Sequence, residues 1–226
     1  MVKERQTIVM DLYLDFLSPG ITTLGPGLRI GLWVQGCSFR CDGCISPDLW
    51  QREEQQRVEV LQVFQQILSY APENTGLTVS GGEPFEQAEA LGAIFLLIRQ
   101  YTALDILVYS GYTLDEILSG SKAKKEMLRL TDVLIDGRYH KDLPTNKLWR
   151  GSDNQQMHLL SERAQKYSSF IEEEYSLSRL FQIEITTENN FRIIGIPGKG
   201  DMERFKKGLF KRGLILNRIT EREKEF

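Results

Sequence analysis

The sequence predicts an α/β fold in which parallel strands, with helices outside them, form a partial (β/α) barrel. Short apolar runs of strand composition alternate with segments of helical periodicity between residues 28 and 136, which is typical of parallel βαβ units. Polar and glycine-rich motifs follow the ends of successive strands, where such folds place their sites. A chain of 226 residues also buries enough surface to fold without disulfide bridges.

The expected strands are marked by β-branched and aromatic residues, and the expected helices by apolar residues that recur every three or four positions. Thr113 and Glu116 have the spacing of a capping box, which predicts the start of one helix. In chain order the expected elements are strand 28–35, helix 58–68, strand 77–80, helix 86–101, strand 105–110, the helix that begins after Thr113, and strand 132–136.

The pattern becomes less regular after residue 136. Residues 137–154 are rich in turn-forming residues, so we expect a long functional loop there. The remaining expected elements are a helix in 161–180, strands 181–187 and 191–196 joined as a hairpin by 188–190, and a helix at 202–212 capped by Asp201. We therefore expect a core with the site in residues 1–160, and a C-terminal hairpin and helix packed on it in residues 161–226.

Charge and hydropathy exclude two classes of function. With 28 Lys and Arg against 31 Asp and Glu the net charge is −3, so we expect no direct binding of nucleic acid. The longest apolar run, residues 93–98, is far shorter than the roughly 20 residues that cross a bilayer. Lys3 and Arg5 are followed by Asp11 and Asp15 and not by the apolar core of a secretory signal, so we expect a cytoplasmic protein with reduced thiols.

All three cysteines of the chain, Cys37, Cys41 and Cys44, form one CxxxCxxC run directly after an expected strand. This clustering indicates a ligand site and not a structural bridge. A 4Fe-4S cluster normally takes four cysteine thiolates, so three would leave one iron open. An open position allows a metal site to bind a substrate as well as to hold the fold.

A zinc site is the alternative for the same cysteines. His140 or His158 would then supply the fourth ligand. Zinc ligands in proteins more often come as CxxC pairs combined with a second CxxC or a pair of histidines, a spacing that this chain lacks. The sequence therefore favours an iron–sulfur site over a zinc site. If they bind no zinc, we expect both histidines to be exposed or hydrogen-bonded residues without a catalytic role.

A second motif, Ser80-Gly81-Gly82-Glu83-Pro84, follows the next expected strand. Glycine lets a backbone approach a ligand closely, and free backbone groups beside one carboxylate suit a ligand ammonium group. A Gly-Gly turn after a strand is by itself usually only a turn. Its position after a three-cysteine loop, at βα spacing, is far more specific than either motif alone.

Together the two motifs resemble those of the radical S-adenosylmethionine (SAM) enzymes. The resemblance implies that Cys37, Cys41 and Cys44 hold a 4Fe-4S cluster whose open iron is chelated by the amino and carboxylate groups of SAM. One electron from the cluster then cleaves SAM and releases a 5′-deoxyadenosyl radical. It also implies that Ser80, Gly81, Gly82 and Glu83 bind the methionine amino group of SAM.

Within that superfamily the chain resembles the glycyl-radical-activating enzymes, specifically the activators of anaerobic ribonucleotide reductase. The residues that carry the likeness are 25–29, 34–36, Trp50, 80–84, 111–116, 132–139 and 149–155. The resemblance implies hydrogen abstraction from one glycine of a large reductase subunit, with flavodoxin or ferredoxin as electron donor. Residues 161–226 extend beyond the short members of this group.

The resemblance implies further contacts to SAM. Asp136 and Arg138 are expected to contact the cofactor, and Ser110 to bind its carboxylate or ribose, although residues of these types at strand ends often only form turns. Many superfamily members carry an aromatic residue just before the last cysteine. Here that residue is Gly43, so we expect Phe39 to cover the cluster instead.

Two other functions stay open. A radical SAM enzyme of the same build could act on another peptide, a nucleoside or a small molecule, with residues 161–226 enclosing that substrate. A non-catalytic iron–sulfur redox protein is the second alternative. The motif of Gly81, Gly82 and Glu83 argues against it, because an electron carrier needs no SAM pocket.

Overall fold

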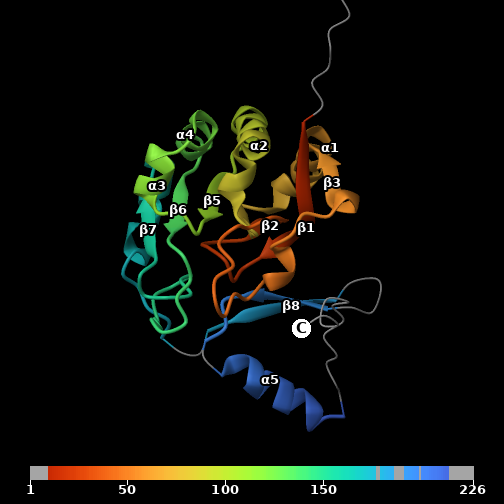
Figure 1. Ribbon diagram of the computed structural model, residues 1–226, viewed down its shortest axis with the longest axis vertical. Coiled ribbons are helices and arrows are strands. Elements are labelled where there is room, and N and C mark those ends of the chain that lie inside the picture. Colours follow the sequence, from red (N-terminus) through yellow and green to blue (C-terminus); the bar gives the residue numbers. More distant parts are fainter. Residues whose placement is uncertain (1–9, 177–178, 186–190, 199, 214–226) are drawn as a thin grey trace, which may run out of the picture.

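A mixed seven-stranded sheet forms the centre of the computed structural model, which describes residues 10–176, 179–185, 191–198 and 200–213 (Figure 1). The strand order is β3-β1-β2-β4-β5-β6-β7. The strands are β1 (Asp11–Ile21), β2 (Arg29–Val34), β3 (Arg57–Glu59), β4 (Gly76–Gly81), β5 (Asp105–Tyr109), β6 (Val133–Asp136) and β7 (Gln156–Leu159). A separate two-stranded ribbon joins β8 (Phe181–Ile185) to β9 (Phe191–Gly195) in antiparallel register.

The four central strands β2, β4, β5 and β6 are parallel, as the sequence predicts. They match the expected strands 28–35, 77–80, 105–110 and 132–136 within two residues at each end. The mixed α/β class is therefore confirmed. The sheet does not close into a barrel, because β3 and β7 stand at its two edges. The partial-barrel shape stays a prediction.

The three antiparallel strands β1, β3 and β7 were not predicted from the sequence. In β1 the alternation of apolar and polar residues is broken where the register shifts between Leu14 and Phe16 and again between Ser18 and Ile21. Such irregularities hide a strand from a search for period two. Strand β7 has only four residues, of which Met157 alone is buried, so its sequence carries little signal.

Four helices lie together on one side of the sheet, and a fifth, α5, lies with β8 at the other end of the molecule (Figure 1). They are α1 (Val60–Tyr70), α2 (Ala88–Tyr101), α3 (Leu114–Ser119), α4 (Lys122–Arg129) and α5 (Asp201–Phe210). Short 3₁₀ helices occur at Pro47–Leu49, Glu54–Gln56, Ala71–Glu73, Pro84–Gln87 and Glu162–Phe170. No described helix is long and apolar enough to cross a membrane.

Two local expectations about helices were wrong. The stretch 161–180 forms no α-helix in its described part, where a 3₁₀ helix covers Glu162–Phe170. Helix α5 is not capped by Asp201. Its N-cap is Gly200, whose left-handed backbone ends the preceding turn, and the Asp201 carboxylate accepts a hydrogen bond from the Gly198 amide at 2.6 Å. The capping box of Thr113 and Glu116 is confirmed at the start of α3.

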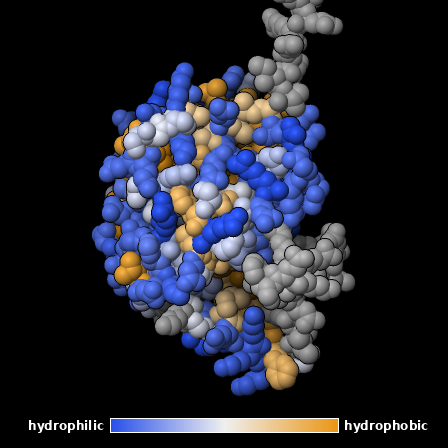
Figure 2. Space-filling model, in the orientation of Figure 1, coloured by the Kyte–Doolittle hydropathy of each residue, from blue (hydrophilic) through white to orange (hydrophobic). Residues whose placement is uncertain are grey.

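The main hydrophobic core lies between the sheet and helices α1 and α2. Apolar stripes of both helices pack on the inward side chains of the central strands. Its fully buried members include Ile67, Leu91, Ile94, Phe95 and Ile98 from the helices, and Ile30, Leu32, Leu77, Val79 and Val108 from the strands. The face of the molecule in Figure 2 is mostly hydrophilic, with apolar residues near its middle, at its upper edge and at its lower end.

A buried ion pair ties the strands together at their amino ends. Arg29 is fully buried, and its guanidinium lies 2.7 Å from Asp105, which starts β5. The same guanidinium donates to the Thr78 hydroxyl at 2.6 Å, and the Tyr167 hydroxyl donates to Asp105 at 2.5 Å. Gly76 completes the pocket, because a Cβ there would lie 2.5 Å from Arg29. One charge pair therefore joins β2, β4, β5 and the 3₁₀ helix at Glu162–Phe170.

The β8–β9 ribbon contacts the end of β1 and the loop that follows. The side-chain amide of Gln182 donates to the Gly20 carbonyl at 3.1 Å, and the Thr23 hydroxyl donates to the Ile194 carbonyl at 3.0 Å. Ile194 is buried against Trp33 and its neighbours. The ribbon matches the expected hairpin. The expected turn 188–190 and residues 186–187 lie outside the described residues. The division of the chain at residue 160 stays a prediction.

We expect Asp105→Ala to lower the free energy of unfolding by about 3–5 kcal/mol, because it leaves the buried Arg29 charge without its partner. Urea unfolding followed by circular dichroism measures the loss. The double variant Arg29→Met with Asp105→Leu removes both charges and should recover much of it. A single variant as stable as the wild type would contradict the importance of this pair.

Candidate functional site

The loop that carries the three cysteines begins where β2 ends, and backbone hydrogen bonds close its base. The Gly36 amide donates to the Leu49 carbonyl at 2.8 Å, and the Cys37 amide donates to the Trp50 carbonyl at 3.0 Å. Above the base, the backbone amide and the hydroxyl of Ser38 both donate to the Glu86 carboxylate, at 2.9 and 2.5 Å. The cysteines thus lie on a loop whose two ends are fixed to each other.

The three thiols are free and partly buried. Burial raises the pKa of Cys37 and Cys41 above the ordinary value, while backbone N–H groups directed at both sulfurs act in the opposite sense. The Ser46 amide donates to the Cys44 sulfur at 3.4 Å. Amides directed at sulfur favour thiolate, the form that binds iron.

Among the described residues, no three metal-ligating side chains lie close enough together to hold an ion in this conformation. The donor set fits an iron–sulfur cluster by its chemistry: three cysteines on one anchored loop, with amides directed at their sulfurs. The thiols have to turn toward one point to bind it. His158 lies against Asp136, with Nε2 3.1 Å from Oδ2, so it approaches a carboxylate and not a cysteine.

The Gly-Gly turn at the end of β4 packs against the base of the cysteine loop. Gly81 has a φ of +106°, and a Cβ there would lie 2.4 Å from the Val34 carbonyl oxygen. A Cβ on Gly82 would lie 2.3 Å from the Gly36 carbonyl oxygen. The sequence analysis expected these glycines to bring the backbone close to a ligand. The close approach seen here is to the chain itself, while Ser80 pairs with Trp33 inside the sheet.

Glu83 is buried, and its carboxylate accepts three hydrogen bonds from the chain. One oxygen accepts from the Phe85 amide and the Ser110 hydroxyl, each at 2.9 Å, and the other accepts from the Gly111 amide at 2.7 Å. The Glu83 amide also donates to the Gly36 carbonyl at 2.7 Å. Burial raises the pKa of Glu83 to about 7, although the three hydrogen bonds act to lower it. This side chain therefore joins the ends of β4 and β5.

Asp136, at the end of β6, is occupied in a similar way. Its Oδ2 accepts the Leu114 amide at 2.7 Å, which holds the first turn of α3, and its Oδ1 accepts the Gln156 amide at 3.3 Å. Burial by itself would raise the pKa of Asp136, but His158 and these two amides outweigh it and hold the pKa below its ordinary value. The structure thus places Glu83, Ser110 and Asp136 at the ends of neighbouring strands. Each of these side chains forms hydrogen bonds with other groups of the protein.

Phe39 and Arg138 meet beside this group. The Arg138 guanidinium lies 4.4 Å from the centre of the Phe39 ring, and the Tyr112 ring contacts Phe39 edge to face at 4.7 Å. Arg138 is exposed and lies 3.4 Å from Glu116. The sequence analysis expected Phe39 to cover the cluster. In this conformation the ring packs on Gly111, where a Cβ would lie only 2.6 Å from it.

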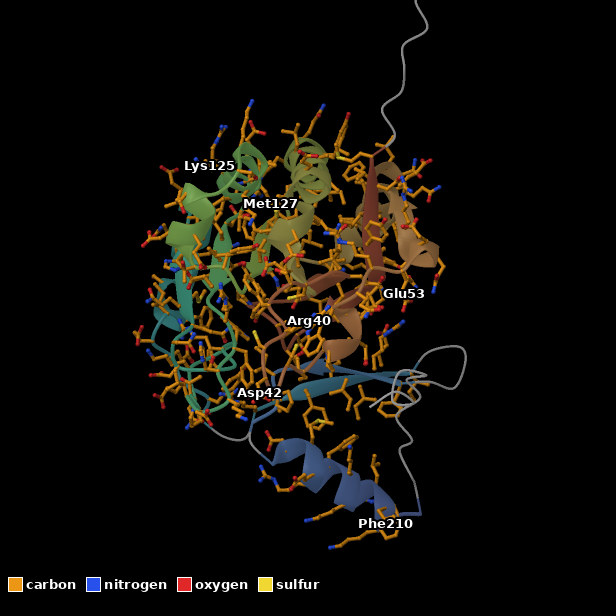
Figure 3. The ribbon with its side chains drawn as sticks, viewed as in Figure 1. Arg40, Asp42, Glu53, Lys125, Met127 and Phe210 are labelled. Atoms are coloured by element: carbon orange, nitrogen blue, oxygen red, sulfur yellow. The ribbon has the colours of Figure 1, made fainter. Side chains whose placement is uncertain are left out.

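Two residues of the long loop 137–154 contact the cysteine loop and were missed by the sequence analysis. The Tyr139 amide is directed at the Cys41 sulfur, and a Cβ on Gly43 would lie 3.2 Å from the Tyr139 ring. Lys141 forms an ion pair with Asp42. In the view of Figure 3, Arg40 lies near the middle of the molecule and Asp42 below it, toward α5. The opposite charges of Lys141 and Asp42 were the only signal in the sequence for this contact. The two residues lie too far apart along the chain for any local pattern to connect them.

The motif at 149–155 supports this loop from within. The Asn154 side chain donates to the Arg138 carbonyl and the Gln155 side chain donates to the Gly137 carbonyl, each at 2.8 Å. Arg150 is buried and donates to the Ile171 carbonyl at 2.5 Å. These contacts organise the loop, which carries Tyr139 and Lys141 to the cysteines.

A profile of the family described as "4Fe-4S single cluster domain" matches residues 23–158. The chain belongs to this family. The matched residues include all three cysteines, the Gly-Gly turn, Glu83 and Asp136. The match ends at residue 158, so β8, β9 and α5 lie outside it. An iron–sulfur cofactor is the cofactor of this family by its description.

Several relatives carry the name anaerobic ribonucleoside-triphosphate reductase-activating protein. The relative from Enterobacteria phage T4 is 35% identical over 138 residues, which cover 59% of this chain and 85% of the relative. The relative from Escherichia coli K12 is 32% identical over 143 residues, which cover 60% of this chain and 91% of the relative. The relative from Haemophilus influenzae is 33% identical over 153 residues, which cover 65% of this chain and 96% of the relative.

We expect Gly82→Ala to loosen the base of the cysteine loop, because the added Cβ would collide with the backbone of Gly36. The free energy of unfolding should fall by about 1–3 kcal/mol, and the iron retained after reconstitution should fall with it. Gly208→Ala in α5 is the matched control, since its Cβ meets nothing within 4 Å. Equal iron content in the two variants would refute this role of Gly82.

The raised pKa of Glu83 predicts a pH dependence of stability. The folded protein binds the Glu83 proton more tightly than the unfolded chain, whose pKa is near 4.5, so this stabilisation is present at low pH and is lost as the pH rises to about 7. Relative to Glu83→Gln, which cannot titrate, the wild type should lose about 3 kcal/mol between these pH values. Urea unfolding across the range measures the difference. Parallel curves for the two proteins would contradict it.

Proposed function

We propose that this protein is a radical SAM activating enzyme that installs a glycyl radical on a partner subunit similar to anaerobic ribonucleotide reductase. The observation that carries the proposal is the anchored three-cysteine loop, which packs against the turn of Gly81, Gly82 and Glu83 at the ends of parallel strands. The names of the relatives from phage T4, Escherichia coli and Haemophilus influenzae support it.

In this proposal Cys37, Cys41 and Cys44 hold a 4Fe-4S cluster and leave one iron for SAM. A reduced cluster with SAM bound supplies one electron to the sulfonium, which yields methionine and a 5′-deoxyadenosyl radical. The base of the loop and the tether from Ser38 to Glu86 fix where the cysteines lie. Amides from the loop itself and from Tyr139 stabilise the thiolates.

We assign the amino-acid end of SAM to the group around Glu83. A carboxylate offers about four lone-pair positions, and the chain uses three of those on Glu83. The fourth can accept an ammonium group, with the backbone of Ser80, Gly81 and Gly82 alongside. Arg138 is an exposed cation next to this group and suits the SAM carboxylate.

Ser110 and Asp136 contribute to the same site by holding other groups of the protein in place. Ser110 donates to Glu83 and accepts from the Tyr112 amide at 3.0 Å, so it sets the direction of the Glu83 carboxylate. Asp136 holds the start of α3, which carries Glu116 to the Arg138 guanidinium. We therefore treat both as positioning residues for the proposed SAM site.

The unclosed sheet supports a protein substrate. If the strands β2, β4, β5 and β6 form the partial barrel that the sequence predicts, the barrel is open at the side and admits a loop of another protein. The proposed hydrogen donor is a glycine on such a loop, which becomes the glycyl radical as 5′-deoxyadenosine forms. The proposed electron donor is a small cytoplasmic redox protein such as flavodoxin or ferredoxin.

Anaerobic reconstitution should load about four iron and four sulfide ions per chain. The loaded and reduced protein should then cleave SAM to methionine and 5′-deoxyadenosine, and each of Cys37→Ala, Cys41→Ala and Cys44→Ala should abolish both results. Addition of a glycyl-radical reductase subunit should give the electron-paramagnetic-resonance doublet of a glycyl radical. One equivalent of zinc without iron uptake would end the proposal, and SAM cleavage without that doublet would point to another substrate.

A further inference from the structure

The Phe39 ring and the Glu83 carboxylate both lie against Gly111. A Cβ on Gly111 would be 2.6 Å from the Phe39 ring and 3.4 Å from the Glu83 oxygen that accepts the Gly111 amide. Ring and carboxylate thus occupy the same side of Gly111, where a side chain is missing. Glu83 is only 1% exposed in this position.

The ring is held from two further directions. Tyr112 contacts it edge to face at 4.7 Å, and the Arg138 guanidinium lies over it at 4.4 Å from its centre. Lys124 in turn lies 3.4 Å from the centre of the Tyr112 ring. Arg138, the two aromatic rings and Lys124 therefore form one continuous row of contacts, which we call the stack. Aromatic pairs and cation–π contacts each contribute modest stabilisation, so the stack can open.

We propose that Phe39 is a gate over Glu83, which is closed without ligand and opens when a zwitterionic amino-acid group enters the site. This inference rests on the proposed function, in which SAM supplies that group. The ligand ammonium takes the unused position on Glu83. The ligand carboxylate draws Arg138 from the Phe39 ring, which removes the contact that holds the ring closed.

The gate has a cost in affinity that can be measured. A closed conformation that must open before binding weakens the apparent affinity by the fraction of molecules that are open. With one aromatic pair and one cation–π contact holding the ring, this fraction is about one in five to one in fifty. A protein without the ring should bind the ligand more tightly by the same factor.

Two variants open the gate by different means. Phe39→Ala removes the ring. Gly111→Ala keeps it but adds a methyl group that displaces the ring, and Gly111 has no positive φ that would make alanine strained. Phe210→Ala is the matched control, because this phenylalanine is 69% exposed at the end of α5 (Figure 3), far from the cysteine loop in sequence. All proteins are compared at equal iron content after anaerobic reconstitution.

The first measurement needs no ligand. The Gly111 amide donates to Glu83 next to the ring, so hydrogen exchange of the peptide that contains Gly111 reports the gate directly. Exchange should be about tenfold faster in Phe39→Ala and Gly111→Ala than in the wild type, and unchanged in Phe210→Ala. Protection equal to that of the wild type in both gate variants would overturn the proposal.

The second measurement is the equilibrium binding of SAM by titration calorimetry. Both gate variants should bind SAM about five- to fiftyfold more tightly than the wild type. If the wild type binds SAM and the variants bind it equally or more weakly, the gate is wrong while the proposed function stands. If none of the proteins binds SAM, the proposed function fails and the gate with it.

Discussion

The site depends on one buried carboxylate. Glu83 accepts hydrogen bonds from the Phe85 amide, the Ser110 hydroxyl and the Gly111 amide, and through them it joins the end of β4 to the end of β5. A buried carboxylate is costly unless such donors surround it. Its pKa of about 7 shows that burial still dominates over these bonds. In the proposed function, an ammonium group that binds here takes the position on Glu83 that these three hydrogen bonds leave unused.

Around this carboxylate the chain brings together segments that are far apart in sequence. The Gly-Gly turn leaves no room for side chains where it meets the base of the cysteine loop, so the two motifs pack backbone against backbone. The loop 137–154 also reaches the cysteine loop, through Tyr139 and Lys141. Both contacts leave the cysteines on a loop that is fixed at its edges, and none of the three thiols is in a disulfide.

The C-terminal ribbon of β8 and β9 lies outside the part of the chain that matches the family. It packs on β1 through Gln182, Thr23 and the buried Ile194, so it covers apolar surface that the core presents near Trp33. The opposite face of the ribbon contacts α5 through the pair Phe181 and Phe205.

The sequence by itself determined the parallel strands, the cysteine loop and the turn with Glu83, because strand composition, motif spacing and glycine pairs are local signals. The 3₁₀ helix in 161–180, the short antiparallel strands and the cap of α5 were decided by tertiary contacts that override weak local patterns. Only the structure placed Phe39 over Gly111 and Lys141 beside Asp42, since each pair joins residues more than seventy positions apart. Such contacts follow from how strand ends converge, and no spacing along the chain encodes them.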